Sequence, residues 1–227
     1  MEQGINGYYV DVVMCIDATG GMIPLINEIK NNALSFFRRL ADAMAVNYAG
    51  VTQLRVKVIF FRDYGYDDEP MNESDFFVLP DQNNELYSFI NSIYASGGAD
   101  CPENALEAIA LALKSDWTTD GYKRRHIIIV FSDAPALELG TRSNSPLYPE
   151  GLPSSLKELT GWWEGTEPSF LGSYQPKAGR LVAFVPMGYP WFDMQVWNRA
   201  WFAFCESGTG LPDVDIQSVI NLVASTI

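Results

Sequence analysis

YVDVVMCIDATGGM, residues 9–22, is the stretch of sequence that decides the fold. Residues 10–16 form a nearly continuous apolar run, which is typical of a parallel strand buried on both faces. The run ends on Asp17, two glycines then allow a tight turn, and the apolar residues beyond the turn recur at helical spacing. We therefore expect a central strand at 9–16 whose carboxyl end presents Asp17 and Thr19 to the start of a helix, at the edge where open α/β sheets bind ligands.

The rest of the chain alternates predicted strands and helices. Strands are expected at 54–61, 75–79, 126–131, 180–185 and 201–205, and helices at about 83–95, 105–113, 154–163, 191–198 and 216–227. This order predicts an α/β fold: a doubly wound, mostly parallel sheet of six strands flanked by helices, with 75–79 as an antiparallel edge strand. At 227 residues we expect one domain over 1–227, in which the proline-rich segment 137–179 is an elaborated loop that carries one helix.

The charge balance and the cysteines restrict the class of protein. The chain has 15 basic and 28 acidic residues, a formal net charge of -13, which argues against a nucleic-acid partner. Its three cysteines are odd in number and far apart, so they predict neither a disulfide framework nor a CxxC metal site, and they fit a reducing compartment. The start of the chain has no signal-peptide pattern, and no apolar run reaches membrane-spanning length. The sequence therefore predicts a cytoplasmic protein without a membrane partner.

Acidic residues recur at three points that the predicted sheet would bring together. Asp17 and Thr19 follow the first strand, Asp133 ends the strand at 126–131, and Asp100 lies in a Gly-Gly loop before a helix. Oxygen ligands without histidine or cysteine suit Mg²⁺, Mn²⁺ or Ca²⁺ and disfavour zinc. A divalent ion would also remove the mutual repulsion of clustered carboxylates. A divalent-metal site at this edge of the sheet is the resulting prediction.

Four short motifs resemble those of the von Willebrand factor type A (vWA) domain family, whose metal-ion-dependent adhesion site uses a D-x-S/T-x-S motif and two later loops. The motifs are DATGGM at 17–22, RDY at 62–64, GGADCPE at 97–103 and SDAP at 132–135. The resemblance covers nearly the whole chain and implies a Rossmann-like vWA fold. One residue departs from the first motif: Gly21 stands where the family has its last serine, so either water or Asp100 has to complete the coordination of the metal.

The resemblance also implies a function. It indicates a non-enzymatic protein-interaction module that binds a divalent metal, with Mg²⁺ as the expected ion. The metal keeps one coordination position for an acidic residue of a protein partner. Intracellular bacterial members of the family are often linked to multiprotein assemblies or to stress and defence systems. The residues that the resemblance assigns to the metal are Asp17, Thr19, Asp100 and Asp133. Those that it assigns to the support of the surrounding loops are Gly21, Arg62, Asp63 and Glu103.

Two other functions stay open at this point. A carboxylate-bound metal can activate water, which would make the chain a Mg²⁺-dependent hydrolase or phosphotransfer protein. Against this, Thr19 stands where phosphatases with an aspartate nucleophile have a second carboxylate, and the single histidine, His126, opens a strand and should lie a strand length from the site. Gly21 favours the third possibility, a metal-free vWA fold that serves as a scaffold.

Some residues of the motifs have a second expected role. Asp100 has the pattern of a helix N-cap, and Glu103 would complete a capping box with it. Arg62 and Asp63 are expected to form a salt bridge that supports the metal loops, with contact between Arg62 and a partner's carboxylate as the alternative. Cys101 is expected to be a structural rather than a reactive cysteine, because the pattern places no histidine base beside it.

Two tryptophans are candidates for contact with the partner. Trp162 and Trp163 are adjacent on the predicted helix at 154–163, so they are not expected to face the core together. Aromatic side chains anchor many protein interfaces. We therefore expect one of the two to be exposed and the segment 137–179 to take part in recognition of the partner. The sequence leaves the identity of the partner and the oligomeric state open.

Overall fold

The computed structural model describes residues 7–47, 50–97, 102–211 and 214–225, and its strands all belong to one sheet. The sheet has seven strands in the order β3-β2-β1-β5-β6-β7, with β4 also paired to β2. The parallel strands are β1 (Tyr8–Asp17), β2 (Val51–Phe61), β5 (Arg124–Phe131), β6 (Gly179–Pro186) and β7 (Ala200–Cys205). The strands β3 (Met71–Glu73) and β4 (Phe77–Leu79) run antiparallel to β2. The expected fold class and the central position of the first strand are therefore confirmed.

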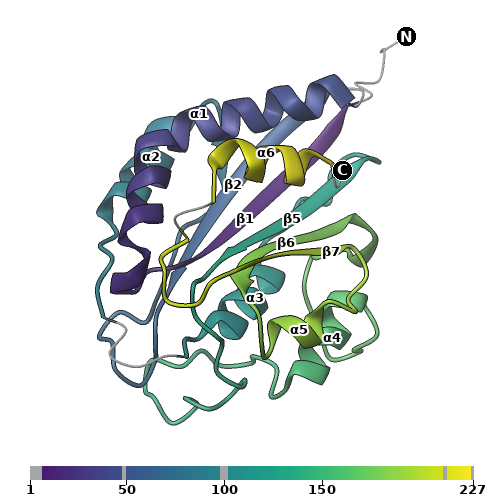
Figure 1. The fold of residues 1–227 in the computed structure, drawn as a ribbon. Coiled ribbons are helices and arrows are strands. Elements are labelled where there is room, and N and C mark those ends of the chain that lie inside the picture. Colours follow the sequence, from purple (N-terminus) through teal and green to yellow (C-terminus); the bar gives the residue numbers. More distant parts are fainter. Residues whose placement is uncertain (1–6, 48–49, 98–101, 212–213, 226–227) are drawn as a thin grey trace.

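Helices cover both faces of this sheet (Figure 1). On one face lie α1 (Ile23–Asn47), which follows the short 3-10 helix η1 (Gly20–Met22), α2 (Asn83–Ser92) and α6 (Ile216–Ser225). On the other lie α3 (Ala105–Lys114), α4 (Leu156–Glu164) and α5 (Trp191–Met194). Val12 and Met14 of β1 belong to the core under the first group of helices, and Val13 and Cys15 belong to the core under the second. The apolar run of β1 is thus explained by burial on both faces.

The antiparallel edge of the sheet differs in one respect from the expectation of six strands. Two short strands share this edge: β3 pairs with residues 59–61 of β2, and β4 pairs with residues 54–56. Between them the Ser74 hydroxyl accepts a hydrogen bond from the Val58 N–H at 3.0 Å, while the Ser74 N–H donates to the Val58 carbonyl at 2.9 Å. Because a side chain replaces a backbone acceptor here, the ladder is interrupted and the edge is divided into two strands, which gives seven strands in total.

The expectation that Trp162 or Trp163 is exposed is wrong, because both side chains are buried. Trp163 stacks on Tyr174 and Trp197, with ring centroids 5.5 and 5.7 Å apart, and its indole N–H donates to the Asn198 carbonyl at 2.8 Å. Trp162 packs against a ring of the following loop, that of residue 170, at 4.8 Å. The chain after α4 folds back over the outer side of the helix, so both of its sides face protein. Neither tryptophan is available to a partner.

The described part of the chain contains no helix that combines the length and the apolar character needed to cross a membrane.

Candidate functional site

Asp17 lies at the carboxyl end of β1, fully buried, and both of its carboxylate oxygens are hydrogen-bonded. The N–H and the hydroxyl of Thr19 donate to Oδ1 at 2.9 and 2.7 Å. The hydroxyl of Ser132, which follows β5, donates to Oδ2 at 2.9 Å. Two neighbouring parallel strands therefore end at one carboxylate, as the sequence predicted for the motifs DATGGM and SDAP. Ser132 is the residue that the earlier assignment of ligands missed, although it belongs to the SDAP motif.

The electrostatics of Asp17 favour a bound cation. The pKa of its carboxyl group is raised to about 6, mainly by burial. The hydrogen bonds from Thr19 and Ser132 act in the opposite direction and lower this pKa, and the negative charge of Asp133 raises it. The charged form of a buried carboxylate next to a second one is costly without a counter-charge. A divalent ion placed beside the two groups would remove this cost.

Asp133 is held by the loop between β7 and α6. Its Oδ2 accepts a hydrogen bond from the Gly210 N–H at 2.7 Å, and its main-chain carbonyl accepts bonds from the Gly208 N–H at 2.8 Å and the Ser207 hydroxyl at 3.1 Å. None of the four motifs lies in this loop, and their spacing does not predict its contact with Asp133. Its closely spaced glycines, in ESGTG at 206–210, were the available signal, since both have positive φ.

Gly21 occupies the position of the last serine in the family motif, and it lies next to the carboxylate of Asp133. A Cβ atom added to Gly21 would lie 3.0 Å from Asp133 Oδ2. This contact is tight, so a serine at this position would require the Asp133 carboxylate to shift by a few tenths of an ångström. The departure from the motif therefore removes one potential oxygen ligand and suits the present position of Asp133.

Asp100 and Cys101, which the sequence placed in the second loop, lie outside the described residues. Glu103 is described, and its expected role in a capping box is wrong. The helix α3 begins at Ala105 with Asn104 as its N-cap, so Glu103 precedes the helix. Instead, Glu103 forms an isolated parallel bridge with Ala136: its N–H donates to the carbonyl of residue 135 at 3.1 Å, and its carbonyl accepts from the N–H of residue 137 at 2.8 Å. Glu103 thus ties the second loop to the segment that follows Asp133.

Arg62 and Asp63 do not pair with each other as expected. The buried guanidinium of Arg62 donates to three backbone carbonyls, those of Ala18, Glu69 and Tyr94, at 3.1, 2.7 and 2.5 Å. Arg62 therefore supports the loop that contains Thr19, in agreement with a structural role.

Asp63 is instead an anchor for the segment after β5. Its buried carboxylate forms a bidentate ion pair with Arg142, with nitrogen–oxygen distances of 2.7 and 2.6 Å. Nearby, the hydroxyl of Tyr148 donates to the buried carboxylate of Glu107 at 3.0 Å. These two contacts fix the first part of the elaborated segment onto the loop after β2 and onto α3.

The donors gathered at the edge have the chemistry of a site for a hard cation. They are the carboxylates of Asp17 and Asp133 and the hydroxyls of Thr19 and Ser132. Within the residues that the structure describes, no three histidine, cysteine or acidic side chains are grouped for a metal. Oxygen donors of this kind fit Mg²⁺, which retains several waters and needs few protein ligands.

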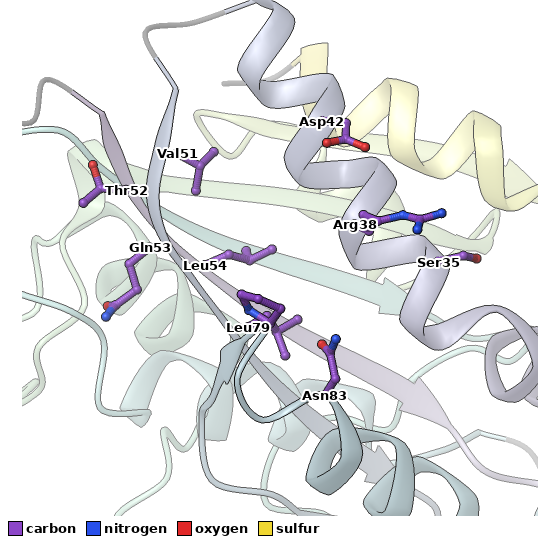
Figure 2. Close-up of a pocket in the computed structure, with 10 residues that line it drawn as sticks. Ser35, Arg38, Asp42, Val51, Thr52, Gln53, Leu54, Leu79 and Asn83 are labelled. Carbon is purple, nitrogen blue, oxygen red and sulfur yellow. The ribbon is translucent and has the colours of Figure 1, made fainter.

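Hollows on the surface around the sheet include one beside the candidate site and one far from it. One, of about 420 Å³, adjoins the candidate site and is lined by Arg62, Tyr66, Tyr94 and the acidic residues 67–69. The other, of about 680 Å³, lies at the opposite end of β2, between α1, β2 and the start of α2. Figure 2 shows its apolar floor of Val51, Leu54 and Leu79, with Arg38 and Asp42 of α1 above them. None of the candidate metal ligands lies in this second hollow.

Comparisons with known proteins bear on the fold. No known protein-family profile matches the chain. Over 148 residues the chain is 26% identical to the alpha-protein kinase vwkA of Dictyostelium discoideum, a match that covers 65% of this chain and 22% of the kinase. The chain therefore spans about a fifth of the length of that relative.

Solved structures with the same fold include a pilus adhesin and a matrix protein of the mussel byssus. Two structures of the pilus adhesin SpaC from Lactobacillus rhamnosus GG give TM-scores of 0.57 and 0.55 at 10% and 12% identity, each over 97% of this chain and 30% of the adhesin. Proximal thread matrix protein 1 from the mussel byssus gives a TM-score of 0.51 at 9% identity, over 97% of this chain and 47% of the matrix protein. The chain shares its α/β architecture with these proteins.

Proposed function

We propose that this chain is a non-enzymatic protein-interaction domain of the vWA type, with a metal-ion-dependent adhesion site that binds Mg²⁺ and an acidic group of a protein partner. The observation that supports this most is the meeting of Asp17, Thr19, Ser132 and Asp133 at one sheet edge, where the hydroxyls orient the carboxylate of Asp17. The same residues carry the motif resemblance. Mn²⁺ and Ca²⁺ suit the same oxygen donors.

The residues that would hold the metal are Asp17, Thr19 and Asp133, with Ser132 as a further hydroxyl at the same carboxylate. Asp100 belongs to this set on sequence grounds. When bound, the metal would supply a positive charge with an open coordination position for a carboxylate. The chain's own contribution is to hold the ligands in place through Arg62, which supports the Thr19 loop, and through the Gly210 N–H on Asp133.

Calorimetric titration with Mg²⁺ tests the proposal directly. Asp17→Asn and Asp133→Asn keep the shape of the side chain but remove its charge, so each should weaken Mg²⁺ binding about tenfold or more. Asp133→Asn keeps an acceptor for the Gly210 N–H, whereas Asp17→Asn keeps one of the two oxygens that accept hydrogen bonds from Thr19 and Ser132. Asp120→Asn, at an exposed aspartate near the amino end of β5, is the matched control and should bind like the wild type. Absence of Mg²⁺ binding by the wild type, or equal binding by all three variants, would contradict the proposal.

The partner's acidic group needs its own test. A partner identified by affinity capture should bind in Mg²⁺, be released by a chelator, and fail to bind the Asp17→Asn variant. Alanine substitution of one acidic residue of the partner should reproduce that loss. Binding that withstands the chelator would favour the metal-free scaffold instead.

The hydrolase or phosphotransfer alternative has one observation in its favour, the 26% identity to part of an alpha-protein kinase. The geometry gives it little support, because His126 lies opposite Asp11 in the strand register and is buried far along β5 from Asp17. A screen of phosphatase, nuclease and ATPase activity with Mg²⁺ distinguishes the two functions. Turnover by the wild type that Asp17→Asn abolishes would establish the enzyme. The cytoplasmic location, without nucleic acid or membrane as partner, stays a prediction.

A further inference from the structure

The strand β7 forms one edge of the sheet and is apolar along its whole length. Its sequence is AWFAFC, residues 200–205, without a charged residue, and all six residues are half-buried. Within the described part of the chain, β7 pairs only with β6. An apolar edge strand of this kind is a template for pairing with another strand.

The free backbone groups of β7 can be identified from its register. The Leu181 N–H donates to the Arg199 carbonyl at 3.0 Å, and Leu181 lies opposite Ala200. In a parallel ladder alternate residues bond to the neighbouring strand, so the N–H and C=O groups of Ala200, Phe202 and Phe204 point away from β6. No loop or side-chain hydrogen bond from the described residues reaches these groups.

The opposite edge of the sheet is protected in ways that β7 is not. There β3 and β4 have three residues each, and the interruption at Ser74 separates them. Pro70 and Pro80 flank the pair, and Glu73 adds a charge. Short strands, prolines and charges are the usual means by which proteins prevent edge pairing. The contrast indicates that β7 is an edge that another strand covers.

The face of β7 toward α6 leaves space beside the strand. A hollow of about 320 Å³ has a mixed lining there. Its apolar residues include Ala203 and Cys205 of β7, Phe184 of β6, and Leu211 and Val214 of the following loop, and its polar residues are Glu206, Thr209, Asp215 and Ser218. A strand added to β7 would therefore find free backbone groups at the edge and room for one large side chain on this face.

We propose that β7 pairs antiparallel with β7 of a second copy of this chain, so that the two sheets become continuous. The outward residues must face one another, which more than one register allows. Of these, the register centred on Phe202 sets Phe202 opposite Phe202 of the second copy and Ala200 opposite its Phe204. The same register sets Trp201 opposite Ala203 of the other copy. Each large ring other than Phe202 thus meets a small residue, and the Trp201 ring is the side chain that would fill the hollow beside Ala203.

The charges at the two ends of β7 agree with the antiparallel direction. Arg199 precedes the strand and Glu206 follows it. An antiparallel pair brings opposite charges to each end, whereas a parallel pair would bring like charges together. Arg199 also lies 3.6 Å from Glu164 of its own chain, so the fit of the side chains is the stronger argument. This interface does not involve the metal site and goes beyond the proposed function.

Light scattering and sedimentation over about 1 to 500 µM protein test the dimer, because this range covers weak and standard interfaces. The wild type should approach twice the mass of one chain, in chelator as well as in Mg²⁺. Ala200→Lys and Phe204→Glu should each weaken the dimer at least tenfold, while circular dichroism confirms that both variants are folded. Tyr122→Lys, at a fully exposed ring far from β7 in the sequence, is the control and should dimerise like the wild type.

Mixing the two β7 variants tests the register. A mixed dimer has one native Ala200–Phe204 pair and one Lys–Glu pair, so the mixture should recover most of the dimer that each variant loses alone. A monomeric wild type throughout the concentration range would overturn the proposal. So would a dimer that both substitutions leave intact, or a mixture that shows no recovery.

Discussion

His126 should make the stability of this protein fall on mild acidification, and its surroundings give the reason. It is the single histidine of the chain and is fully buried in β5. The Gln175 N–H donates to its Nδ1 at 3.2 Å, its Nε2 lies 3.1 Å from the Thr118 carbonyl, and its ring stacks on Trp117 with centroids 4.8 Å apart. Nδ1 is therefore an acceptor and Nε2 carries the proton, so the ring is neutral. Protonation would direct a second N–H against the Gln175 N–H.

The direction and size of the effect follow from the pKa. The pKa of His126 is lowered to about 4, mainly by burial. The negative charge of Asp11 and the hydrogen bond with the Thr118 carbonyl raise this pKa, and the positive charges of Arg124 and Arg55 lower it, but burial has the largest effect. The unfolded chain, with a histidine pKa of about 6.5, takes up a proton first as the pH falls, so acidification favours unfolding. The free energy of unfolding should drop by about 2 kcal/mol between pH 7 and pH 5 through this residue, and the contribution should level off below the folded pKa near 4.

Two measurements check this prediction. Because the chain has one histidine, its imidazole C–H resonances in an NMR titration need no assignment, and they should show a neutral ring down to pH 5. Urea unfolding at pH 7 and pH 5 should show the loss of stability in the wild type and a smaller loss in His126→Gln, which has no titrating ring. A folded-state midpoint near 6.5 in the NMR titration would refute the reasoning, whether or not the variant folds.

Three further predictions concern stability and are measured by urea unfolding at pH 7. Gly210→Ala should lower the free energy of unfolding by more than about 2 kcal/mol, because φ is +73° and the new Cβ would lie 2.3 Å from a backbone oxygen. Gly208→Ala, with the same φ and nothing within 4 Å of the new Cβ, should lower it by about 1 kcal/mol. Equal losses in the two variants would contradict the close packing at Gly210. Arg142→Ala should lower the free energy of unfolding by about 3 kcal/mol, because it leaves the buried carboxylate of Asp63 without its ion pair. Lys57→Ala should lower it by less than about 1 kcal/mol, because its partner Glu73 is 43% exposed. The reverse order would be inconsistent with the burial of Asp63. Trp163→Ala should cost about 4 kcal/mol, and a loss below about 1 kcal/mol would show that the ring is not in the core.

The burial of both Trp162 and Trp163 could not be predicted from the local sequence pattern. Helical spacing shows which residues share a side of a helix, and it correctly separated Trp162 from Trp163. It does not show whether a later loop returns over the outer side, as the chain around Phe170 does here. In the same way, the segment 71–73 is too short and too polar to be recognised as a strand from its sequence. It is a strand because it pairs antiparallel with residues 59–61 of β2, a contact between separate segments.

The sequence by itself determined the order of strands and helices apart from β3, the central position of β1, and the placement of Asp17 and Asp133 at one edge. These follow from patterns over a few residues, since burial on two faces requires a continuous apolar run and parallel strands end on the same side. Only the tertiary structure decided which groups hold those carboxylates: Ser132 bonds Asp17 from 115 residues away, and Gly210 bonds Asp133 from 77 residues away. A hydrogen bond between distant segments depends on the path of the loops through space, and the residues adjacent in the sequence do not specify that path.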